Sequence, residues 1–328
     1  MKFTKYFLII FSLLILFFVF RYWSFANKTL HISVLKTLFT KGDIRNIENQ
    51  TNVLILGLPG DTNDGPDLTD TIIVVNYNFD TNRAVMIGIP RDIWSNALKD
   101  KINSAYVYGE SVKKSGGLIL AKAEVGSIIG VPIQYGLAVD FDDFKKIIDY
   151  LGGVNINVET GFIDKKYPIK GKENDDCSGD EEFKCRYETI KFKKGLNSMD
   201  SDQALKFIRS RNATSSEGND FARIKRQQLV ISSIQSKVFK KIGIFNLNKL
   251  KDFYITIDKL IERDLSNQQA SIIIKNILLK RNFKLDKITI PNKLFFSPEY
   301  SSYDGRYVLV PINDDYSDIH KYIEKNLN

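Results

Sequence analysis

Four arginines flank one short polar loop in the segment FIRSRNATSSEGNDFARIKRQQ, residues 207–228. They are Arg209, Arg211, Arg223 and Arg226. Arginine carries a planar, permanently charged group whose N–H donors match the oxygens of phosphate or carboxylate. The spacing therefore predicts an anion-binding site. The net charge of +8 makes nucleic acid the first anion to consider, although 47 basic and 39 acidic residues also describe an ordinary mixed surface.

Histidine is nearly absent from the chain, which removes several kinds of catalytic site. His31 precedes the predicted domain, and His320 lies in a predicted C-terminal helix. A Ser-His-Asp or Cys-His nucleophile system therefore lacks a base, and a His-rich zinc site is excluded. The phosphate-binding pattern G-x-x-x-x-G-K-[ST] is absent as well. Carboxylates and arginines remain as the groups that can do chemistry.

Aspartates are concentrated in the loop GDTNDGPDLTD, residues 60–70, between two apolar runs. They are Asp61, Asp64, Asp67 and Asp70. Oxygen ligands beside a strand suit Mg²⁺, which typically takes one or two carboxylates plus substrate phosphates. A solvated turn, in which Asp and Gly favour tight backbone geometry, is the alternative interpretation of this loop alone.

A second group of charges follows in IPRD, which places Arg91 and Asp92 at the end of a predicted strand, and in KIN, which adds Lys101. Adjacent Arg and Asp residues are often surface pairs. Together with the aspartate loop and the arginines, they are the groups that phosphoryl transfer needs, because there the protein mainly positions reactants and stabilises charge. For the arginines, the alternative is a set of helix-surface ion pairs with Glu217 and Asp220.

The N-terminal segment MKFTKYFLIIFSLLILFFVFRYW approaches the ~20 residues needed to cross a bilayer. Its early lysines indicate a cytoplasmic N-terminus, and Tyr22 and Trp23 suit the interface. A cleaved signal peptide would need a small-x-small site, and RYWSFAN offers a poor one. The expected parts are a cytoplasmic tip and single membrane anchor at 1–27, a stalk at 28–47 and an extracytoplasmic domain at 48–328. This placement argues against nucleic acid as a partner.

The two cysteines, Cys177 and Cys185, flank SGDEEFK within residues 160–195, a polar segment that we expect to be a surface excursion. Cysteines at this spacing can close a small disulfide ring in an oxidising compartment. A zinc pair fits less well because no histidine lies nearby.

Strand and helix patterns alternate along the chain. Strands are predicted at 51–58, 71–78, 83–90, 135–141, 154–159, 287–291 and 307–311. Helices are predicted at 116–130, 142–151, from about 200, 221–241 (with Asp220 as its cap), 247–261, 266–280 and 317–327. This mixture predicts a three-layer α/β or α+β domain, with a central mixed sheet flanked by helices.

The ordered blocks LILGLPGD, LTDTIIVV, MIGIPRDIW, KINSAYVYG, FDDFKKIIDYLGGVNINV, GLNSMDSDQALKFIRSR and NDFARIKRQQ resemble the LytR-CpsA-Psr family over about residues 52–241. The resemblance implies a phosphotransferase on the outer face of a bacterial cytoplasmic membrane. It would move a glycopolymer, with its phosphate, from a polyprenyl-pyrophosphate carrier to a sugar hydroxyl of peptidoglycan or another envelope glycan, assisted by Mg²⁺ or by Mn²⁺. The lipid would occupy an apolar tunnel supplied by residues 116–130 and the apolar strands.

Matching positions imply roles for individual residues. Asp70 matches the family's metal-linked aspartate, and Asp92 is a candidate for binding metal or activating the acceptor. The implied pyrophosphate contacts are Arg91, Lys101, Arg209, Arg211, Arg223 and Gln227. The expected catalytic residues are Arg91, Asp92, Arg209 and Arg211. Arg209, Arg211 and Arg223 should converge with Arg91 on one phosphate site, while Lys225 should face solvent and Arg226 has no assigned role.

Two positions depart from the family pattern. Leu68 stands where the family usually has an arginine, and Pro59 where it has an aspartate, so that Asp61 or Asp64 must replace the second metal ligand. Two other functions therefore remain open. One is a polyprenyl-pyrophosphate hydrolase that uses water in place of the sugar, and the other is a non-catalytic lipid-binding or regulatory envelope protein.

Overall fold

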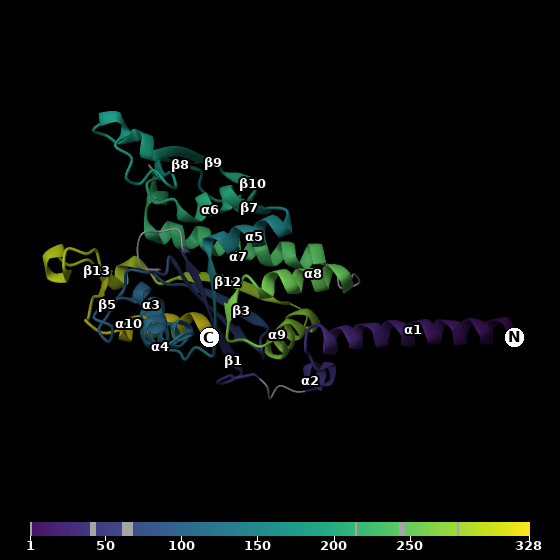
Figure 1. The fold of residues 1–328 in the computed structure, drawn as a ribbon. Helices are drawn as coiled ribbons and strands as arrows, with labels where there is room; N and C mark the ends of the chain where they lie inside the picture. Colours follow the sequence, from purple (N-terminus) through teal and green to yellow (C-terminus); the bar gives the residue numbers. More distant parts are fainter. Residues whose placement is uncertain (1, 40–43, 61–67, 214, 243–246, 281) are drawn as a thin grey trace.

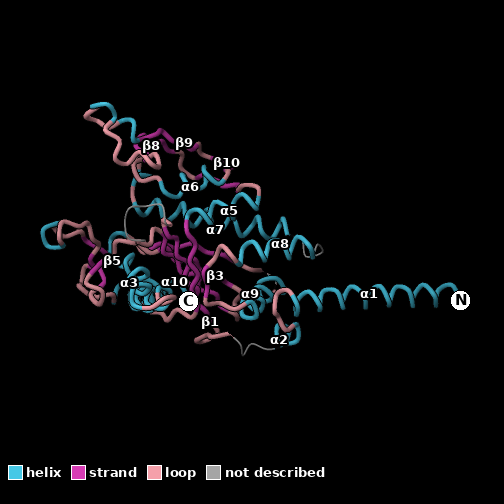
Figure 2. Tube along the Cα trace, in the orientation of Figure 1, coloured by secondary structure: helices cyan, strands magenta, loops and turns pink. Residues whose placement is uncertain are grey.

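Figures 1 and 2 show the fold of the chain as a computed structural model. The structure describes residues 2–39, 44–60, 68–213, 215–242, 247–280 and 282–328. Asp61 and Asp64, one of which was expected to replace the missing metal ligand, lie outside the described residues.

A mixed six-stranded sheet in the order β11-β6-β1-β2-β3-β12 forms the centre of the domain. Its strands are β1 (Gln50–Leu58), β2 (Thr71–Asn78), β3 (Arg83–Gly88), β6 (Tyr135–Asp140), β11 (Glu262–Arg263) and β12 (Lys284–Thr289). The first three form an antiparallel meander, while β6 runs parallel to β1 and β12 parallel to β3. The predicted strands at 51–58, 71–78, 83–90 and 135–141 are confirmed.

Helices cover both faces of this sheet, as Figure 1 shows. One face packs against α3 (Ala105–Val112), α4 (Gly117–Ile129) and α10 (Ser317–Leu327). The other face lies under α5 (Phe141–Leu151), α7 (Asp220–Ile242), α8 (Leu247–Asp258) and α9 (Asn267–Leu279). Alternation along β1 serves both layers, because Leu54 and Leu56 join the core under α4 while Ile55 points to the α7 side. The predicted three-layer class is confirmed.

A second, smaller core lies beside α7. It is built from β7 (Val154–Val158) with β10 (Gly195–Met199), β8 (Phe162–Pro168) with β9 (Tyr187–Phe192), and α6 (Ser201–Arg209). The sequence interpretation of 160–195 as a surface excursion missed β8 and β9. Their inward residues alternate with lysines and other polar side chains, so no continuous apolar run marked them as strands.

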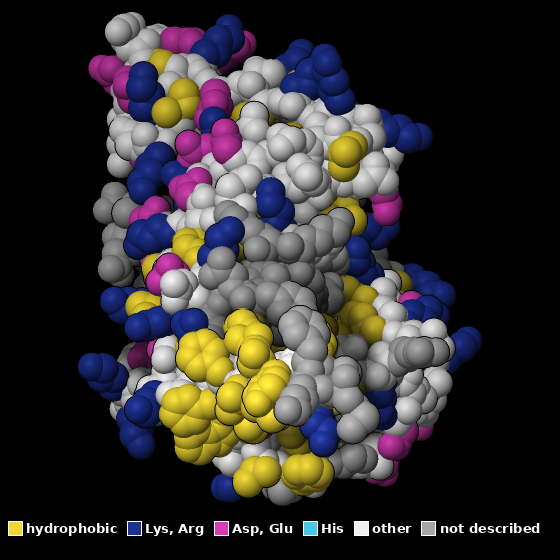
Figure 3. All heavy atoms as spheres, turned by 90° about the vertical axis from the view of Figure 1, so that its right-hand side faces the viewer, with side chains coloured by type: hydrophobic (Ala, Val, Ile, Leu, Met, Phe, Trp, Pro, Cys, Tyr) yellow, Lys and Arg dark blue, Asp and Glu magenta, His cyan; other side chains and the backbone are white. Residues whose placement is uncertain are grey.

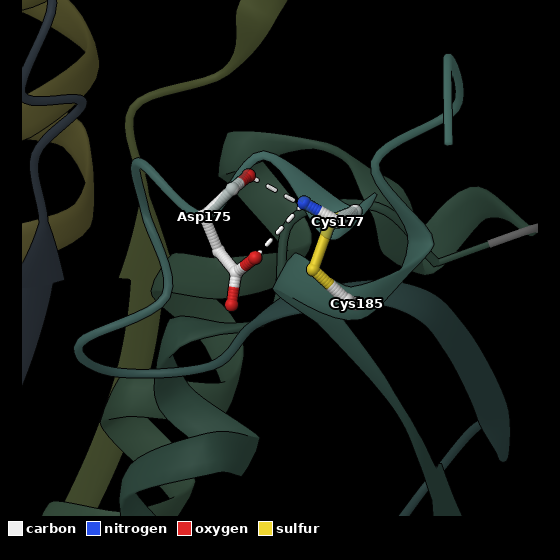
Figure 4. A group of neighbouring side chains, drawn as sticks. All are labelled: Asp175, Cys177 and Cys185. Atoms are coloured by element: carbon white, nitrogen blue, oxygen red, sulfur yellow. Dashed lines mark hydrogen bonds between the residues drawn. A yellow bond between two sulfur atoms is a disulfide. The ribbon is translucent and has the colours of Figure 1, made fainter. Parts of the chain in front are cut away.

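The tip of this hairpin carries a disulfide between Cys177 and Cys185 (Figure 4). Asp175 lies beside it and its Oδ1 accepts a hydrogen bond of 2.9 Å from the Cys177 amide. Because both sulfurs are bonded to each other, this group of three side chains is not a metal site.

Short strand pairs complete the structure near the ends of the sheet. They are β4 (Trp94–Ser95) with β5 (Asp100–Lys101) and β13 (Phe295–Phe296) with β14 (Val310–Pro311). The strand predicted at 307–311 is thus reduced to two residues and a bridge from Leu309 to Ile93.

The first helix, α1 (Lys2–Lys28), projects away from the domain in Figure 1. Its segment Lys5–Lys28 is long and apolar enough to cross a membrane, and none of the tested window is buried in the protein. The following residues do not form a free stalk, because α2 (Val34–Phe39) packs on α9. Two hydrogen bonds hold the connection, from the Ser33 amide to Gln268 (2.7 Å) and from Asn267 Nδ2 to the Leu30 carbonyl (2.8 Å).

The start of α7 differs from the prediction that Asp220 caps this helix. The side chain of Asn219 accepts the capping hydrogen bond from the Ala222 amide at 2.9 Å. Asp220 instead forms an ion pair with Arg223, at 3.2 Å. Asn and Asp are both strong caps, so the sequence alone did not decide between neighbours.

Arg226 anchors this end of α7 to α6. It is 2% exposed, and its donors reach the carbonyls of Phe207 (2.9 Å) and Ser210 (2.6 Å). Its Nη1 also forms an ion pair with Glu217 at 2.9 Å, and the guanidinium lies over the Phe162 ring. The residue without an assigned role is therefore a structural arginine that orients the polar loop.

We predict that Arg226→Met lowers the free energy of unfolding by about 3 kcal/mol, because it leaves Glu217 and two buried carbonyls without their partner. Urea denaturation of the full chain in detergent measures this. Lys225→Met, at the exposed neighbouring position, is the control and should change stability little. Equal stability of wild type and Arg226→Met would refute the structural role.

Candidate active site

Asp70, at the start of β2, is the centre of the charged cluster. Its Oδ1 accepts hydrogen bonds from Arg91 Nη1 and from Arg211 Nη2, the latter at 2.7 Å. Its carbonyl accepts a longer bond of 3.4 Å from Gln227 Nε2 on α7. Among the described residues, Oδ2 accepts no hydrogen bond, so one carboxylate oxygen is left for a cation.

The backbone around Asp70 is held by two other segments of the chain. The Asp70 amide donates to the Gly57 carbonyl at 2.8 Å, and the Thr69 amide donates to the Asn103 carbonyl at 3.0 Å. Gly57 is required here, because a Cβ at this position would lie 2.9 Å from the side chain of Thr71. The ends of β1, β2 and β3 are therefore fixed relative to one another before any ligand binds.

Asp92 and Lys101 form the second half of the cluster. Lys101 Nζ lies 2.8 Å from Asp92 Oδ1, and Arg91 Nε lies 3.6 Å from Asp92 Oδ2. Asp92 is 3% exposed. Burial opposes its ionisation, but the cations of Arg91 and Lys101 outweigh burial and hold the pKa of this carboxyl below its usual range. Asp92 is therefore ionised at neutral pH.

Arg223 is the least satisfied of the arginines. It is 2% exposed, and its Nη2 has the partner Asp220, but its Nε and Nη1 are buried and have no hydrogen-bond partner among the described residues. Burial and the nearby Arg211 lower its pKa to about 10, although Asp220 opposes this. Buried donors without partners are rare in native proteins. They make Arg223 a candidate for binding an anion.

A buried carboxylate, Asp164 on β8, shapes the turn that carries Arg211. Its Oδ2 accepts hydrogen bonds from Ser210 Oγ (2.7 Å) and from the amides of Arg211 (3.3 Å) and Asn212 (3.1 Å). The sequence analysis missed this residue, because nothing near Asp164 in the chain relates it to a loop 46 residues away.

Arg209 does not join the other arginines in this structure. Its guanidinium lies 4.8 Å from the centre of the Phe141 ring, and it lines a separate pocket of about 170 Å³ with Tyr167 and Pro59. The predicted convergence thus holds for Arg91, Arg211 and Arg223 but not for Arg209. Arg209 is the last residue of α6, so it precedes the turn at residues 210–212 that Asp164 stabilises. The role of Arg209 in binding pyrophosphate stays a prediction.

An apolar cavity of about 290 Å³ begins beside Asp70. Gly57, Thr71 and Gln227 line its polar end. Its walls come from β1, β6, α5, α7 and α8 and include Ile55, Leu137, Val139, Phe144, Ile147, Ile234 and Ile257. The expectation that residues 116–130 supply this wall is wrong, because α4 packs on the opposite face of the sheet. An apolar helix pattern does not tell which face of a sheet the helix covers.

A second apolar cleft, of about 610 Å³, lies between α2, α8 and α9. It shares Phe253, Ile257 and Ile261 with the apolar cavity, so the two are neighbours. Leu30 and Ile32, which directly follow α1, line its outer part. Figure 3 looks onto the side from which α1 projects, and hydrophobic side chains gather there.

A polar groove of about 1160 Å³ lies on the other flank of α7. Its lining includes Arg91, Asp92, Lys101, Arg211, Lys225, Lys287 and Tyr307. Lys225 is exposed, as expected, and faces this groove. The charged cluster thus lies between an apolar cavity and a polar groove.

Comparisons with known proteins bear on the family of the chain. A model of the LytR_cpsA_psr family matches residues 24–325. The curated polyisoprenyl-teichoic acid–peptidoglycan teichoic acid transferase TagU of Bacillus mycoides is 27% identical over 229 residues. The match covers 69% of this chain and 64% of TagU, so the chain spans less than two thirds of that relative.

Solved structures show the same fold. The crystal structure of B. subtilis TagV has a TM-score of 0.60 at 20% identity and covers 86% of this chain and 98% of its own. The LytR-CPS2A-psr family protein YwtF (TagT), solved with bound octaprenyl pyrophosphate lipid, has a TM-score of 0.55 at 20% identity, with coverages of 87% and 94%. The ordered sequence blocks, the fold and the family model lead to one conclusion: the chain belongs to the LytR-CpsA-Psr family.

Proposed function

We propose that this protein is a membrane-anchored phosphotransferase. It moves a glycopolymer, with its phosphate, from a polyprenyl-pyrophosphate carrier to a sugar hydroxyl of peptidoglycan or another envelope glycan. The observation that carries the proposal is the pair of unpartnered, buried donors of Arg223, whose charge interacts with those of Arg91, Arg211 and Asp70. Gln227, which bonds to the Asp70 carbonyl, also lines the apolar cavity. An anionic head and a long apolar tail are the two parts of such a carrier.

The charges of the cluster leave an excess of one cation, which favours an anion. Arg91, Lys101, Arg211 and Arg223 supply four cations, against the carboxylates of Asp70, Asp92 and Asp220. A pyrophosphate would take the free donors of Arg223 and compete with Asp70 for Arg91 and Arg211. Each hydrogen bond to a charged group contributes roughly 1.5–3 kcal/mol.

The apolar cavity and the neighbouring cleft suit the polyprenyl chain. Aliphatic and aromatic side chains line most of both, although Asp258, Arg263 and Lys275 also line the cleft. The cleft reaches the residues that follow α1. A chain anchored in a bilayer by α1 would present this cleft to the lipid. TagT, which has the same fold, was solved with bound octaprenyl pyrophosphate lipid. This supports the proposal that a polyprenyl chain binds here.

The reaction in our proposal is an in-line displacement at the phosphorus that carries the glycan. The acceptor hydroxyl oxygen forms a bond to this phosphorus, and the bond from phosphorus to the bridging oxygen breaks. Polyprenyl phosphate leaves with the bonding electrons, and Arg91, Arg211 and Arg223 stabilise the charge on the phosphate oxygens. Asp92, ionised and facing the polar groove, accepts the hydroxyl proton.

Mg²⁺, or Mn²⁺ in its place, belongs to the proposal as well. Asp70 would hold it through Oδ2 together with phosphate oxygens, and Asp61 is the proposed second carboxylate. Such a cation would neutralise part of the phosphate charge during the displacement.

The proposed location is the outer face of a bacterial cytoplasmic membrane, with the N-terminus inside and α1 as the single anchor. An oxidising compartment outside the membrane agrees with a disulfide between Cys177 and Cys185.

We predict that Arg211→Ala lowers kcat for transfer by about 10²–10³-fold, as expected for the loss of one donor to a charged transition state. The assay uses the full chain in detergent, a polyprenyl-pyrophosphate oligosaccharide, Mg²⁺ and a peptidoglycan fragment. Lys321→Ala, an exposed position on α10, is the control. Full activity of Arg211→Ala would contradict the proposal. If polyprenyl phosphate is released equally with and without an acceptor, the protein is a hydrolase. If lipid is bound but not turned over, the protein is non-catalytic.

We also predict that Arg223→Met raises the unfolding free energy of the ligand-free protein by about 1 kcal/mol, because it removes a buried charge with unpaired donors. The same variant should lose the stabilisation that inorganic pyrophosphate gives the wild type, which is about 2.7 kcal/mol at a hundredfold excess over Kd. Thermal unfolding with and without pyrophosphate measures both effects. Destabilisation like that expected for Arg226→Met would mean that Arg223 is structural.

A third prediction concerns the length of the lipid. Leu278, on α9, is 51% exposed and lines the apolar cleft. Leu278→Lys should lower kcat/KM for a long polyprenyl donor by about tenfold, equivalent to the burial of roughly two CH₂ groups. A donor short enough for the inner cavity alone should be unaffected. Leu196→Lys, which changes a 77% exposed leucine on β10, is the matched control. An equal loss of kcat/KM for the long and the short donor would show that the end of the polyprenyl chain does not lie in the cleft.

A further inference from the structure

We infer that the polar groove beside α7 binds the acceptor glycan, an anionic sugar chain, and that Lys225, Lys287 and Tyr307 select it. The inference rests on the proposed function, whose transfer step needs an acceptor. It assigns a site and a ligand class to a part of the molecule that the pyrophosphate and its lipid do not occupy.

The position of α7 separates the two substrates. This helix sits directly on β3, since a Cβ on Gly88 would lie 2.1 Å from Ile224 Cγ2. The apolar cavity lies over β1 and β6 on one flank, and the polar groove lies along the ends of β3 and β12 on the other. Neighbouring residues on α7 mark the division, because Gln227 lines the cavity and Gln228 lines the groove.

The geometry of displacement assigns the groove to the acceptor. In phosphoryl transfer the attacking and leaving oxygens lie roughly in line on opposite sides of the phosphorus. The leaving group is the polyprenyl phosphate, whose tail lies in the apolar cavity. The attacking hydroxyl must therefore approach from the far side of Arg91 and Arg211. Both residues line the polar groove, and Asp92 lies in it with them.

The outer part of the groove offers contacts for a sugar chain. Tyr307 presents a ring that is 42% exposed, and Asn292 provides an amide. Lys225 and Lys287 are exposed cations at the groove, with Glu159 as an opposing charge. An acceptor whose sugars or peptides carry carboxylates, as peptidoglycan does, matches the excess of lysine. Among the described residues, neither lysine takes part in an ion pair within 4.0 Å.

The experiment compares the wild type with the double variant Lys225→Ala, Lys287→Ala and with Tyr307→Ala. Each full-length protein is assayed in detergent with a polyprenyl-pyrophosphate oligosaccharide and a soluble peptidoglycan fragment that carries free carboxylates. We expect the KM for the fragment to rise about tenfold in the double variant, at up to roughly 1 kcal/mol per exposed charge pair. The kcat at saturating acceptor and the Kd for the donor alone should remain within about twofold of wild type.

Two controls sharpen this result. Lys225→Arg, Lys287→Arg keeps both charges and should restore a near-normal KM. A fragment with its carboxylates converted to amides should bind the wild type as weakly as the carboxylate fragment binds the double alanine variant. Titration of each fragment into protein without donor measures the preference for carboxylates as a difference in Kd, without turnover.

The outcomes are separable. An unchanged acceptor KM in active variants, or equal affinity for both fragments, overturns the assignment while leaving the transferase intact. Weaker binding of the donor with an unchanged acceptor KM would mean that the groove binds the donor glycan, which also overturns the assignment. Absence of transfer by the wild type contradicts the proposed function itself, and fragment binding in the titration then decides the groove independently.

Discussion

The contact of Asp70 with Arg91 and Arg211 organises the whole site. One carboxylate oxygen holds two guanidinium groups that come from distant segments of the chain, the end of β3 and the turn after α6. Without a ligand, Asp70 pairs with both cations, of which Arg91 is 18% exposed and Arg211 is 43% exposed. Asp70 can serve because Gly57 and Asn103 fix its backbone at the edge of the sheet. An anion that binds here finds the donors of Arg91 and Arg211 already in place. It has to replace only their contacts with Asp70.

Arg223 and Arg226 show how the same helix builds structure and function from the same residue type. Both are 2% exposed and lie one turn apart on α7. Arg226 uses its donors on carbonyls and Glu217, so it fixes the loop that leads to Arg211. Arg223 keeps two donors without partners and has a lowered pKa. Buried donors without partners are rare in native proteins, and each such group calls for a structural or functional explanation.

The two flanks of α7 differ in polarity as the two ends of a lipid-linked glycan do. The apolar cavity opens toward the cleft near α1, and the polar groove opens on the opposite side of the helix. The charged cluster lies where they meet. The chain belongs to the LytR-CpsA-Psr family, and this division agrees with the transfer that we propose.

Periodic apolar residues and ordered motifs are local properties of the chain, so most strands of the central sheet, the layer architecture and the family could be predicted from the sequence alone. The sequence also identified Asp70, Arg91, Arg211, Arg223 and Gln227, whose side chains the structure brings together. Three other features appear only in the folded chain: Arg209 turns toward Phe141, Arg226 is structural, and α5, α7 and α8 rather than residues 116–130 enclose the apolar cavity. The direction of a side chain depends on partners that are distant in the sequence, such as Asp164, which bonds to the Arg211 amide. The local sequence pattern around a residue does not identify such partners.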